Sequence, residues 1–187
     1  MGIYKNQFKI ESIRLQTWDY TNPWWYFVTL NTKNHKEFFG KIENGKMILN
    51  DLGKIAEKYW LEIPLHFPYV GLDYFVIMPH RSHGILALNN HCKDVACNVS
   101  TRPVNERYSS LLPKKYSLSF VIRSYKSAVT KWCNVNNYNY FAWQPRFFER
   151  IIRNERELYN IRNYIEQNPL RWAIDKNNSD NIDYDLF

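Results

Sequence analysis

The sequence predicts a single α+β domain in which an antiparallel sheet is covered by helices. Segments rich in aromatic and β-branched residues come early and are joined by short turns, and one turn contains the Asn44-Gly45 dipeptide, which favours a two-residue hairpin. Segments with apolar residues at helical spacing lie between and after them. At 187 residues the chain is long enough for one sizeable core, and no internal repeat or linker divides it.

Strands are expected where aromatic, β-branched or alternating residues are bounded by turn signals. Five segments have this character: Trp25–Thr32, Phe38–Ile42, Lys46–Leu49, Tyr74–Met78 and His83–Leu88. We expect them to belong mainly to one antiparallel sheet. Phe147–Arg153 is a further, short strand-like segment.

Helices are expected where apolar residues recur every three or four positions. Three segments fit this spacing: Asp51–Trp60, Ser117–Trp132 and Asn154–Asn168. Asn50 and Ser117 suit the N-cap position, and Asn154 with Glu157 has capping-box spacing. Because Pro169 has no amide hydrogen, the last helix is expected to stop after Asn168.

The chain is basic, and its charge is unevenly distributed. The formal net charge is +7, but the last thirteen residues hold four Asp and one Lys, which leaves +10 on residues 1–174. We therefore expect a domain over 1–174 and an acidic polar tail over 175–187. A basic domain with many aromatic residues is typical of nucleic-acid binding, although charge alone fits an ordinary basic domain equally well.

Membrane and secreted classes are disfavoured. The longest apolar runs, such as Tyr74–Met78, are far too short to span a bilayer, and the first residues lack the apolar core of a secretion signal. The three cysteines are an odd number without framework spacing, which favours reduced thiols in the cytoplasm.

Two places could carry chemistry. Tyr164 and Asn168 are four residues apart on the last helix, so they share a face, but most helical tyrosines only edge a core, and Asn168 before Pro169 fits a helix end. His80 and His83 lie near a strand boundary, where two imidazoles could bind a metal. In a regular strand their three-residue spacing points the rings to opposite faces, so this metal signal is weak by itself.

Two blocks of sequence resemble one family. Gly71–Leu88 (GLDYFVIMPHRSHGILAL) is similar to the strand that reads Met-Pro-Asn-His-apolar-His-Gly in REP-associated tyrosine transposases, which belong to the HUH single-tyrosine superfamily. Phe141–Trp172 (FAWQPRFFERIIRNERELYNIRNYIEQNPLRW) resembles their C-terminal block. Weaker similarity extends over most of the chain. The resemblance implies a ferredoxin-like HUH domain.

The resemblance assigns roles residue by residue. Tyr164 falls on the nucleophilic tyrosine, Asn168 on the amide that helps to bind the metal, and His83 on the second histidine of the HUH pair. The first histidine falls on Arg81, which cannot ligate a metal because a guanidinium has no usable lone pair. His80 stands where the family has asparagine.

The implied activity is cleavage and joining of single-stranded DNA. The Tyr164 oxygen attacks a phosphodiester and leaves a 5′-phosphotyrosine and a free 3′-hydroxyl, assisted by Mg²⁺ or Mn²⁺ on His83 and Asn168. The implied partner is single-stranded or hairpin DNA. Clustered arginines near Tyr164 are candidates for phosphate binding, and the alternative is a solvated charged face: Arg146, Arg150 and Arg153. The sequence leaves monomer and homodimer open.

Arg81 leaves three interpretations open. His80 could restore a second imidazole through a bulge at Pro79. Arg81 could contact the phosphate and replace part of the charge of the metal. The site could also be degraded, which would leave a protein that binds hairpin or single-stranded DNA without cutting it. An RNA-binding domain has no motif support. The intact Tyr164 and Asn168 favour the enzyme.

Overall fold

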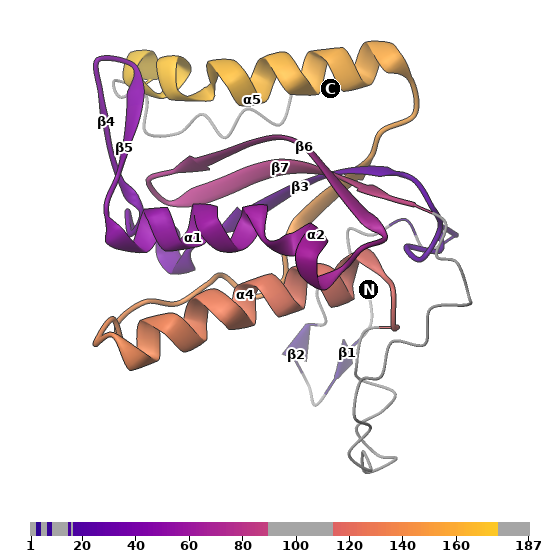
Figure 1. Ribbon diagram of the computed structural model, residues 1–187, viewed down its shortest axis with the longest axis horizontal. Helices are drawn as coiled ribbons and strands as arrows, with labels where there is room; N and C mark the ends of the chain where they lie inside the picture. Colours follow the sequence, from indigo (N-terminus) through magenta and orange to yellow (C-terminus); the bar gives the residue numbers. More distant parts are fainter. Residues whose placement is uncertain (1–2, 5–6, 9–14, 16, 90–113, 176–187) are drawn as a thin grey trace.

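A four-stranded antiparallel sheet forms the middle layer of the molecule (Figure 1). The computed structural model describes residues 3–4, 7–8, 15, 17–89 and 114–175. In spatial order the strands are β6, β7, β3 and β8, with these bounds: Val70–Met78, Arg81–Leu88, Trp25–Asn31 and Phe148–Ile151. The predicted α+β class with an antiparallel sheet is confirmed.

Helices cover both faces of this sheet. One face carries α1 (Asp51–Leu61), the short α2 (Ile63–His66) and α4 (Leu118–Val135), whereas α5 (Glu155–Asp175) lies alone on the other face (Figure 1). The expected helices at 51–60 and 117–132 are confirmed, and each runs slightly further at its C-terminal end. No helix in the described part of the chain is long and apolar enough to cross a membrane.

The larger apolar core lies between the sheet and helices α1 and α4. Alternate residues of β3, such as Tyr26 and Val28, point into it because successive side chains of a strand face opposite sides. Trp60 of α1 is 1% exposed and packs directly on β7. A Cβ added at Gly84 would stand 2.2 Å from its ring, so this close approach requires glycine.

A smaller apolar cluster lies under α5. It consists of residues from β3, β7, α5 and the segment after β8: Phe27, Ile85, Ile152, Ile161 and Ile165. Phe27 and Ile85 are cross-strand partners, so the sheet and the helix meet along one line of apolar contacts. This cluster fixes which face of α5 is turned toward the sheet.

Side-chain caps begin the helices where the sequence predicts. Asn50 and Ser117 each accept the amide N–H three residues further on, at 2.9 and 3.3 Å. Asn154 accepts the N–H of Glu157 at 2.8 Å. The Glu157 carboxylate accepts the N–H of Arg153 at 2.8 Å, so this reciprocal bond is displaced by one residue from the expected capping box.

The expectation that Phe38–Ile42 and Lys46–Leu49 join the main sheet is wrong. They form a separate two-stranded sheet of β4 (Gly40–Glu43) and β5 (Lys46–Leu49), and the Asn-Gly turn between them has positive φ at both residues, as predicted. The chain leaves the main sheet through the 3-10 turn η1 (Lys33–His35). The β4–β5 hairpin could have joined the main sheet beside β3 only by pairing with a free edge of that strand. That edge is paired with β8 instead.

The expectation that Pro169 ends the last helix is also wrong, because α5 continues well beyond it. Proline in a helix interior costs about 3 kcal/mol, since it removes a hydrogen bond and clashes with the preceding turn. Tertiary contacts hold the last turns in place. Leu170 lies against Gly45 of the hairpin, and the Trp172 ring packs on His80 with 4.8 Å between centroids.

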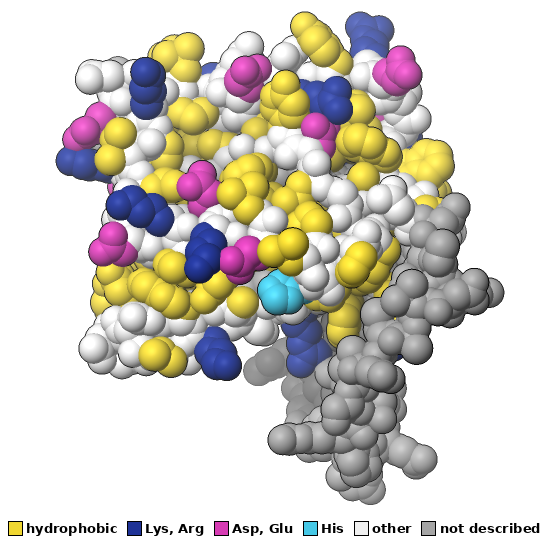
Figure 2. Space-filling model, viewed as in Figure 1, with side chains coloured by type: hydrophobic (Ala, Val, Ile, Leu, Met, Phe, Trp, Pro, Cys, Tyr) yellow, Lys and Arg dark blue, Asp and Glu magenta, His cyan; other side chains and the backbone are white. Residues whose placement is uncertain are grey.

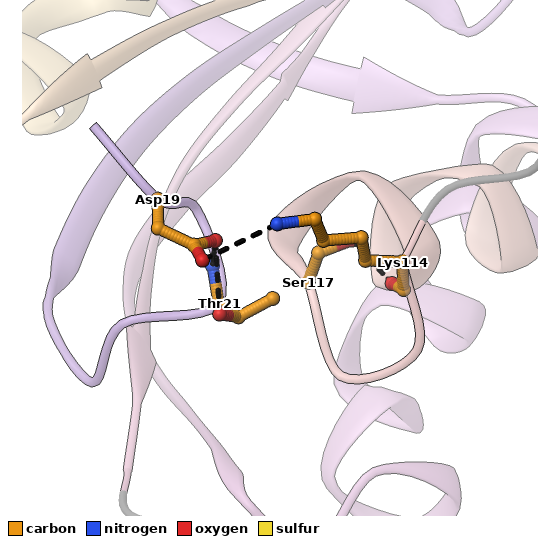
Figure 3. A network of polar contacts seen from close by, with 4 residues as sticks. All are labelled: Asp19, Thr21, Lys114 and Ser117. Atoms are coloured by element: carbon orange, nitrogen blue, oxygen red, sulfur yellow. Dashed lines mark hydrogen bonds and ion pairs between the residues drawn. The ribbon is translucent and has the colours of Figure 1, made fainter. Parts of the chain in front are cut away.

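Polar contacts tie the segment before β3 to the start of α4 (Figure 3). Asp19 accepts the N–H and the hydroxyl of Thr21 at 3.0 and 2.9 Å, and the amine of Lys114 lies 3.4 Å from the same carboxylate. The bonds from Thr21 hold the pKa of Asp19 below its ordinary value. Ser117 donates its hydroxyl to the carbonyl of Lys114 at 2.6 Å, so the network fixes the entry into α4.

The described residues near the N-terminus include two short strands. β1 (Ile3–Tyr4) and β2 (Gln7–Phe8) pair with each other as a small antiparallel sheet. The acidic tail expected over 175–187 lies outside the described residues, apart from Asp175, which is the last residue of α5.

Candidate active site

Strand β7 and helix α5 bring four polar side chains together. Arg81 and His83 are two residues apart on β7, so both point to the same face of the sheet. That face is covered by α5, because the His83 ring stacks on Phe27 of the apolar cluster under this helix, with 5.7 Å between centroids. Tyr164 and Asn168 lie one turn apart on α5.

Two contacts across the interface join these pairs. The rings of His83 and Tyr164 meet edge to face, with centroids 5.3 Å apart. One guanidinium nitrogen of Arg81, Nη2, donates to Oδ1 of Asn168 at 3.4 Å. The four residues to which the resemblance assigns the nucleophile, the amide and the HUH pair are therefore neighbours in the structure.

His83 is buried with one ring nitrogen engaged. It is 3% exposed, and its Nδ1 lies 2.8 Å from the hydroxyl of Thr29, the residue opposite it on β3. Its Nε2 is buried and has no hydrogen-bonding partner in the part of the chain that the structure describes. Burial lowers the pKa of His83 well below the ordinary value of 6.5, and the charge of Arg81 lowers it further. The imidazole is therefore neutral at physiological pH.

Arg81 is held between Asn168 and an aromatic ring. Its guanidinium lies 5.5 Å from the centroid of the Trp172 ring, which is a cation–π contact, while Asn168 is 3% exposed. The cation at the position where the resemblance places the first HUH histidine thus contacts the amide that the resemblance assigns to a metal.

His80 lies in the turn between β6 and β7 rather than in a strand. Its ring packs on Trp172 and on His35, whose ring centroid is 5.2 Å away. Burial lowers the pKa of His80 to about 4, with smaller contributions from the charges of Arg81 and His35. These contacts turn the ring toward the end of α5.

The donor set fits a divalent ion only in part. The unpartnered Nε2 of His83 is suited to a metal, but the Asn168 oxygen accepts a bond from a fixed cation, which a divalent ion would have to displace. Among the described residues no group of three His, Cys, Asp or Glu side chains could hold a metal ion. We therefore derive no chemical step through a metal.

Two of the three predicted phosphate-binding arginines, Arg150 and Arg153, lie shortly before α5. Arg150 forms an ion pair with Glu157, which is seven residues, or about 10 Å along the helix, before Tyr164. Arg153 is exposed beside it. Arg146 is exposed in the turn before β8, and its carbonyl accepts a bond from Lys126 at 3.0 Å. Arg150 and Arg153 thus lie at the N-terminal end of α5, whereas Arg146 lies beside α4.

Basic and acidic side chains are interspersed on the face seen in Figure 2. This face includes the exposed sides of α1 and α5, as in Figure 1. The excess of positive charge is therefore not gathered into a patch of one sign on this side of the described residues.

The sequence did not single out Thr29 or Trp172 as site residues. Thr29 reaches His83 only through the pairing of β3 with β7, 54 residues away in sequence. Trp172 lies beyond Pro169, where the helix was expected to have ended. The signal in the sequence that could have pointed to Trp172 is a large aromatic residue three positions after Pro169.

Comparisons with known proteins agree with this fold. No family model matches the chain. An uncharacterized protein of Haemophilus influenzae is 38% identical over 167 residues, which is 88% of this chain and 91% of that protein. The structure of a REP-associated tyrosine transposase bound to a REP hairpin superposes with a TM-score of 0.58 and 19% identity, over 88% of this chain and 75% of that one. The chain therefore belongs to the same family as the Haemophilus influenzae protein, and it has the fold of a REP-associated tyrosine transposase.

Proposed function

We propose that the protein cleaves and rejoins single-stranded DNA with Tyr164 as the nucleophile. The observation that carries this proposal is the position of Tyr164. Its ring centroid lies 5.3 Å from that of the buried His83. Tyr164 also lies on the same helix as Asn168, which contacts Arg81. A tyrosine beside preorganised polar groups and a fixed cation has the surroundings that attack on a phosphate requires.

In the proposed step the Tyr164 oxygen attacks the phosphorus of a phosphodiester. The bond from this oxygen to phosphorus forms while the bond from phosphorus to the 3′-oxygen breaks, which leaves a 5′-phosphotyrosine and a 3′-hydroxyl. The phenol releases its proton to water, and the departing oxygen takes one from water. Because one phosphodiester is exchanged for another, a second DNA end can reverse the step without ATP.

Tyrosine needs help to react at neutral pH. Its ordinary pKa is about 10, so little of it is ionised, and charge develops on the phosphate as the bond forms. A positive group at the phosphate lowers this barrier. Arg81 would supply this positive group. Its guanidinium contacts Asn168, and Asn168 lies one turn of α5 from Tyr164.

The proposed substrate is a single strand that carries a hairpin. The structural neighbour was solved with a REP hairpin, and this chain has the same fold with +10 on residues 1–174. Arg146 and Arg153, which lie before β8 and before α5, would contact backbone phosphates flanking the scissile bond.

Mg²⁺ or Mn²⁺ would act at this site only by displacing Arg81 from Asn168. His83 would supply a nitrogen ligand through Nε2, and Asn168 an oxygen ligand once Arg81 is displaced. A bound ion would supply Lewis-acid polarisation of the phosphate.

The experiment uses the purified full chain and single-stranded hairpins labelled at either the 5′ or the 3′ end. The proposal predicts that only the fragment 3′ to the cut becomes covalently attached, because Tyr164 takes the 5′-phosphate. Denaturing gels detect the adduct through its label. Attachment of the fragment 5′ to the cut would contradict the proposed polarity.

One other function is favoured by a specific observation. Arg81 in place of a metal-binding histidine fits a protein that binds hairpin DNA on this fold without cutting it. In that case hairpins bind, with an affinity that falls as salt rises, yet no adduct forms with any hairpin or metal.

A further inference from the structure

The position of the expected metal ligand is occupied by a cation with two orienting contacts. Arg81 donates to Asn168 and lies over the ring of Trp172. We propose that Arg81 and His83 form a phosphate site that receives the scissile phosphate directly, with the guanidinium in the place of a metal ion. This inference rests on the proposed function and concerns the same site.

The contacts of Arg81 preorganise it for an anion. Asn168 sits on a helix and Trp172 lies one turn further along, so both restrain the guanidinium from the same side. A guanidinium presents N–H groups in a planar fork that matches two phosphate oxygens. A charged phosphate is a stronger acceptor than the neutral Asn168 amide, so it would compete for the same donor.

His83 completes the site through the nitrogen that has no partner. Thr29 holds Nδ1, and a threonine hydroxyl can either donate or accept a hydrogen bond. When the hydroxyl donates to Nδ1, the proton of the neutral ring lies on Nε2, which then donates to a phosphate oxygen. A phosphate that reaches this buried atom would therefore satisfy Nε2, which lacks a partner among the described residues.

A metal ion would require the opposite arrangement. Nε2 would need its lone pair to bind the ion, so the ring proton would lie on Nδ1. The hydroxyl of Thr29 would then accept a hydrogen bond from Nδ1. The ion would also sit beside a guanidinium, and the two positive charges repel each other. The two arrangements differ in tautomer and in ligand, which makes them separable by measurement.

The first test measures binding without turnover. Nitrogen-15 NMR of the full chain follows the His83 ring and the arginine side chains while inorganic phosphate or Mn²⁺ is added separately. We expect phosphate to shift the signals of His83 and Arg81, and Mn²⁺ at one equivalent to leave His83 unbroadened. Selective broadening of His83 by one equivalent of Mn²⁺, with no phosphate response, would overturn the proposal.

Arg81→His separates the two arrangements further. It restores a His-x-His pair, so we expect Mn²⁺ affinity to rise at least tenfold and phosphate affinity to fall at least tenfold. Arg162→His is the matched control, because Arg162 lies on α5, the helix that covers the face of the sheet with Arg81, but pairs with Asp73 at 2.8 Å. It should leave both affinities unchanged. Unchanged phosphate affinity in Arg81→His would overturn the proposal.

The second test measures adduct formation in EDTA and in Mn²⁺. Equal adduct in both supports a phosphate site that works without a metal. An adduct that forms only with Mn²⁺ overturns this inference and leaves the proposed function intact. If no adduct forms in either, the proposed function fails, and the phosphate titration decides the site alone: a response at Arg81 and His83 supports it, and the lack of one overturns it.

Discussion

The two faces of the main sheet bury different kinds of residue. Under α1 and α4 the buried side chains are mostly apolar, with Ser82 of β7 among the polar exceptions, and Trp60 packs there on Gly84 with no room for a larger residue. Under α5 the apolar cluster is small, and buried polar side chains lie beside it, with His83 and Asn168 each 3% exposed.

This difference separates stability from chemistry. Burying a polar group costs free energy unless it is fully hydrogen-bonded, and, like the Nε1 of Trp60 on the other face, the Nε2 of His83 has no partner among the described residues. An apolar residue there would pack without this cost. We infer that the α1/α4 face supplies most of the stability and that the α5 face keeps polar groups for function.

The largest expected effect is on the apolar face. Trp60→Ala removes a ring that packs against Phe75 and Tyr125, and large-to-small changes of buried aromatic residues cost about 3–5 kcal/mol. Urea unfolding measures this loss. Leu65→Ala, at a side chain that is 77% exposed, is the control and should change the free energy of unfolding by less than about 0.5 kcal/mol. A loss below about 1 kcal/mol for Trp60→Ala would contradict the assignment of stability to this face.

A smaller effect is expected from pH, and it comes from the α5 side. The pKa of His80 is lowered to about 4 in the folded protein, against 6.5 for an ordinary histidine. Between these values the unfolded chain binds more protons than the folded protein, so the free energy of unfolding rises as the pH rises from about 4 to 6.5. The contribution of His80 is lost again as the pH falls through the same window.

His80→Gln should remove this contribution, which is on the order of 2 kcal/mol when partial exposure is taken into account. The measurement is the difference between the unfolding free energies of wild type and variant from pH 4 to pH 7. Since His83 titrates with the same sign in both proteins, only the difference reports on His80. Parallel curves would contradict the burial of His80 as a neutral group.

The smallest expected effect is at Thr29. Thr29→Val keeps the shape of the side chain but removes the hydroxyl that holds His83, and such a bond is worth about 1 kcal/mol. Thr29→Ser keeps the hydroxyl and should preserve the nitrogen-15 shifts of the His83 ring, whereas Thr29→Val should change them. Identical ring shifts in both variants would show that Thr29 does not set the tautomer.

Local patterns were sufficient for the elements whose ends are decided by nearby residues. Asn50 and Ser117 cap helices because their side chains reach an amide three residues away, and the Asn-Gly turn needs only its own backbone preference. The apolar periodicity likewise placed α1 and α4. The resemblance, rather than spacing, identified Tyr164 and Asn168 as site residues.

The failures lie where distant contacts decide the outcome. α5 continues past Pro169 because Leu170 and Trp172 pack on the hairpin and on His80, which no local rule describes. The β4–β5 hairpin stays apart because β8, from the other end of the chain, pairs with β3. Thr29 joins the site for the same reason, through strand pairing.

The central claim is that Tyr164 becomes covalently bonded to DNA. Mass spectrometry of the intact protein after incubation with single-stranded hairpins tests it directly, and peptide mapping locates the bond. Tyr159→Phe is the control, because Tyr159 lies on the same helix but is 64% exposed. We predict adduct at Tyr164 in the wild type and in Tyr159→Phe, and none above background in Tyr164→Phe; equal adduct in wild type and Tyr164→Phe would contradict the account.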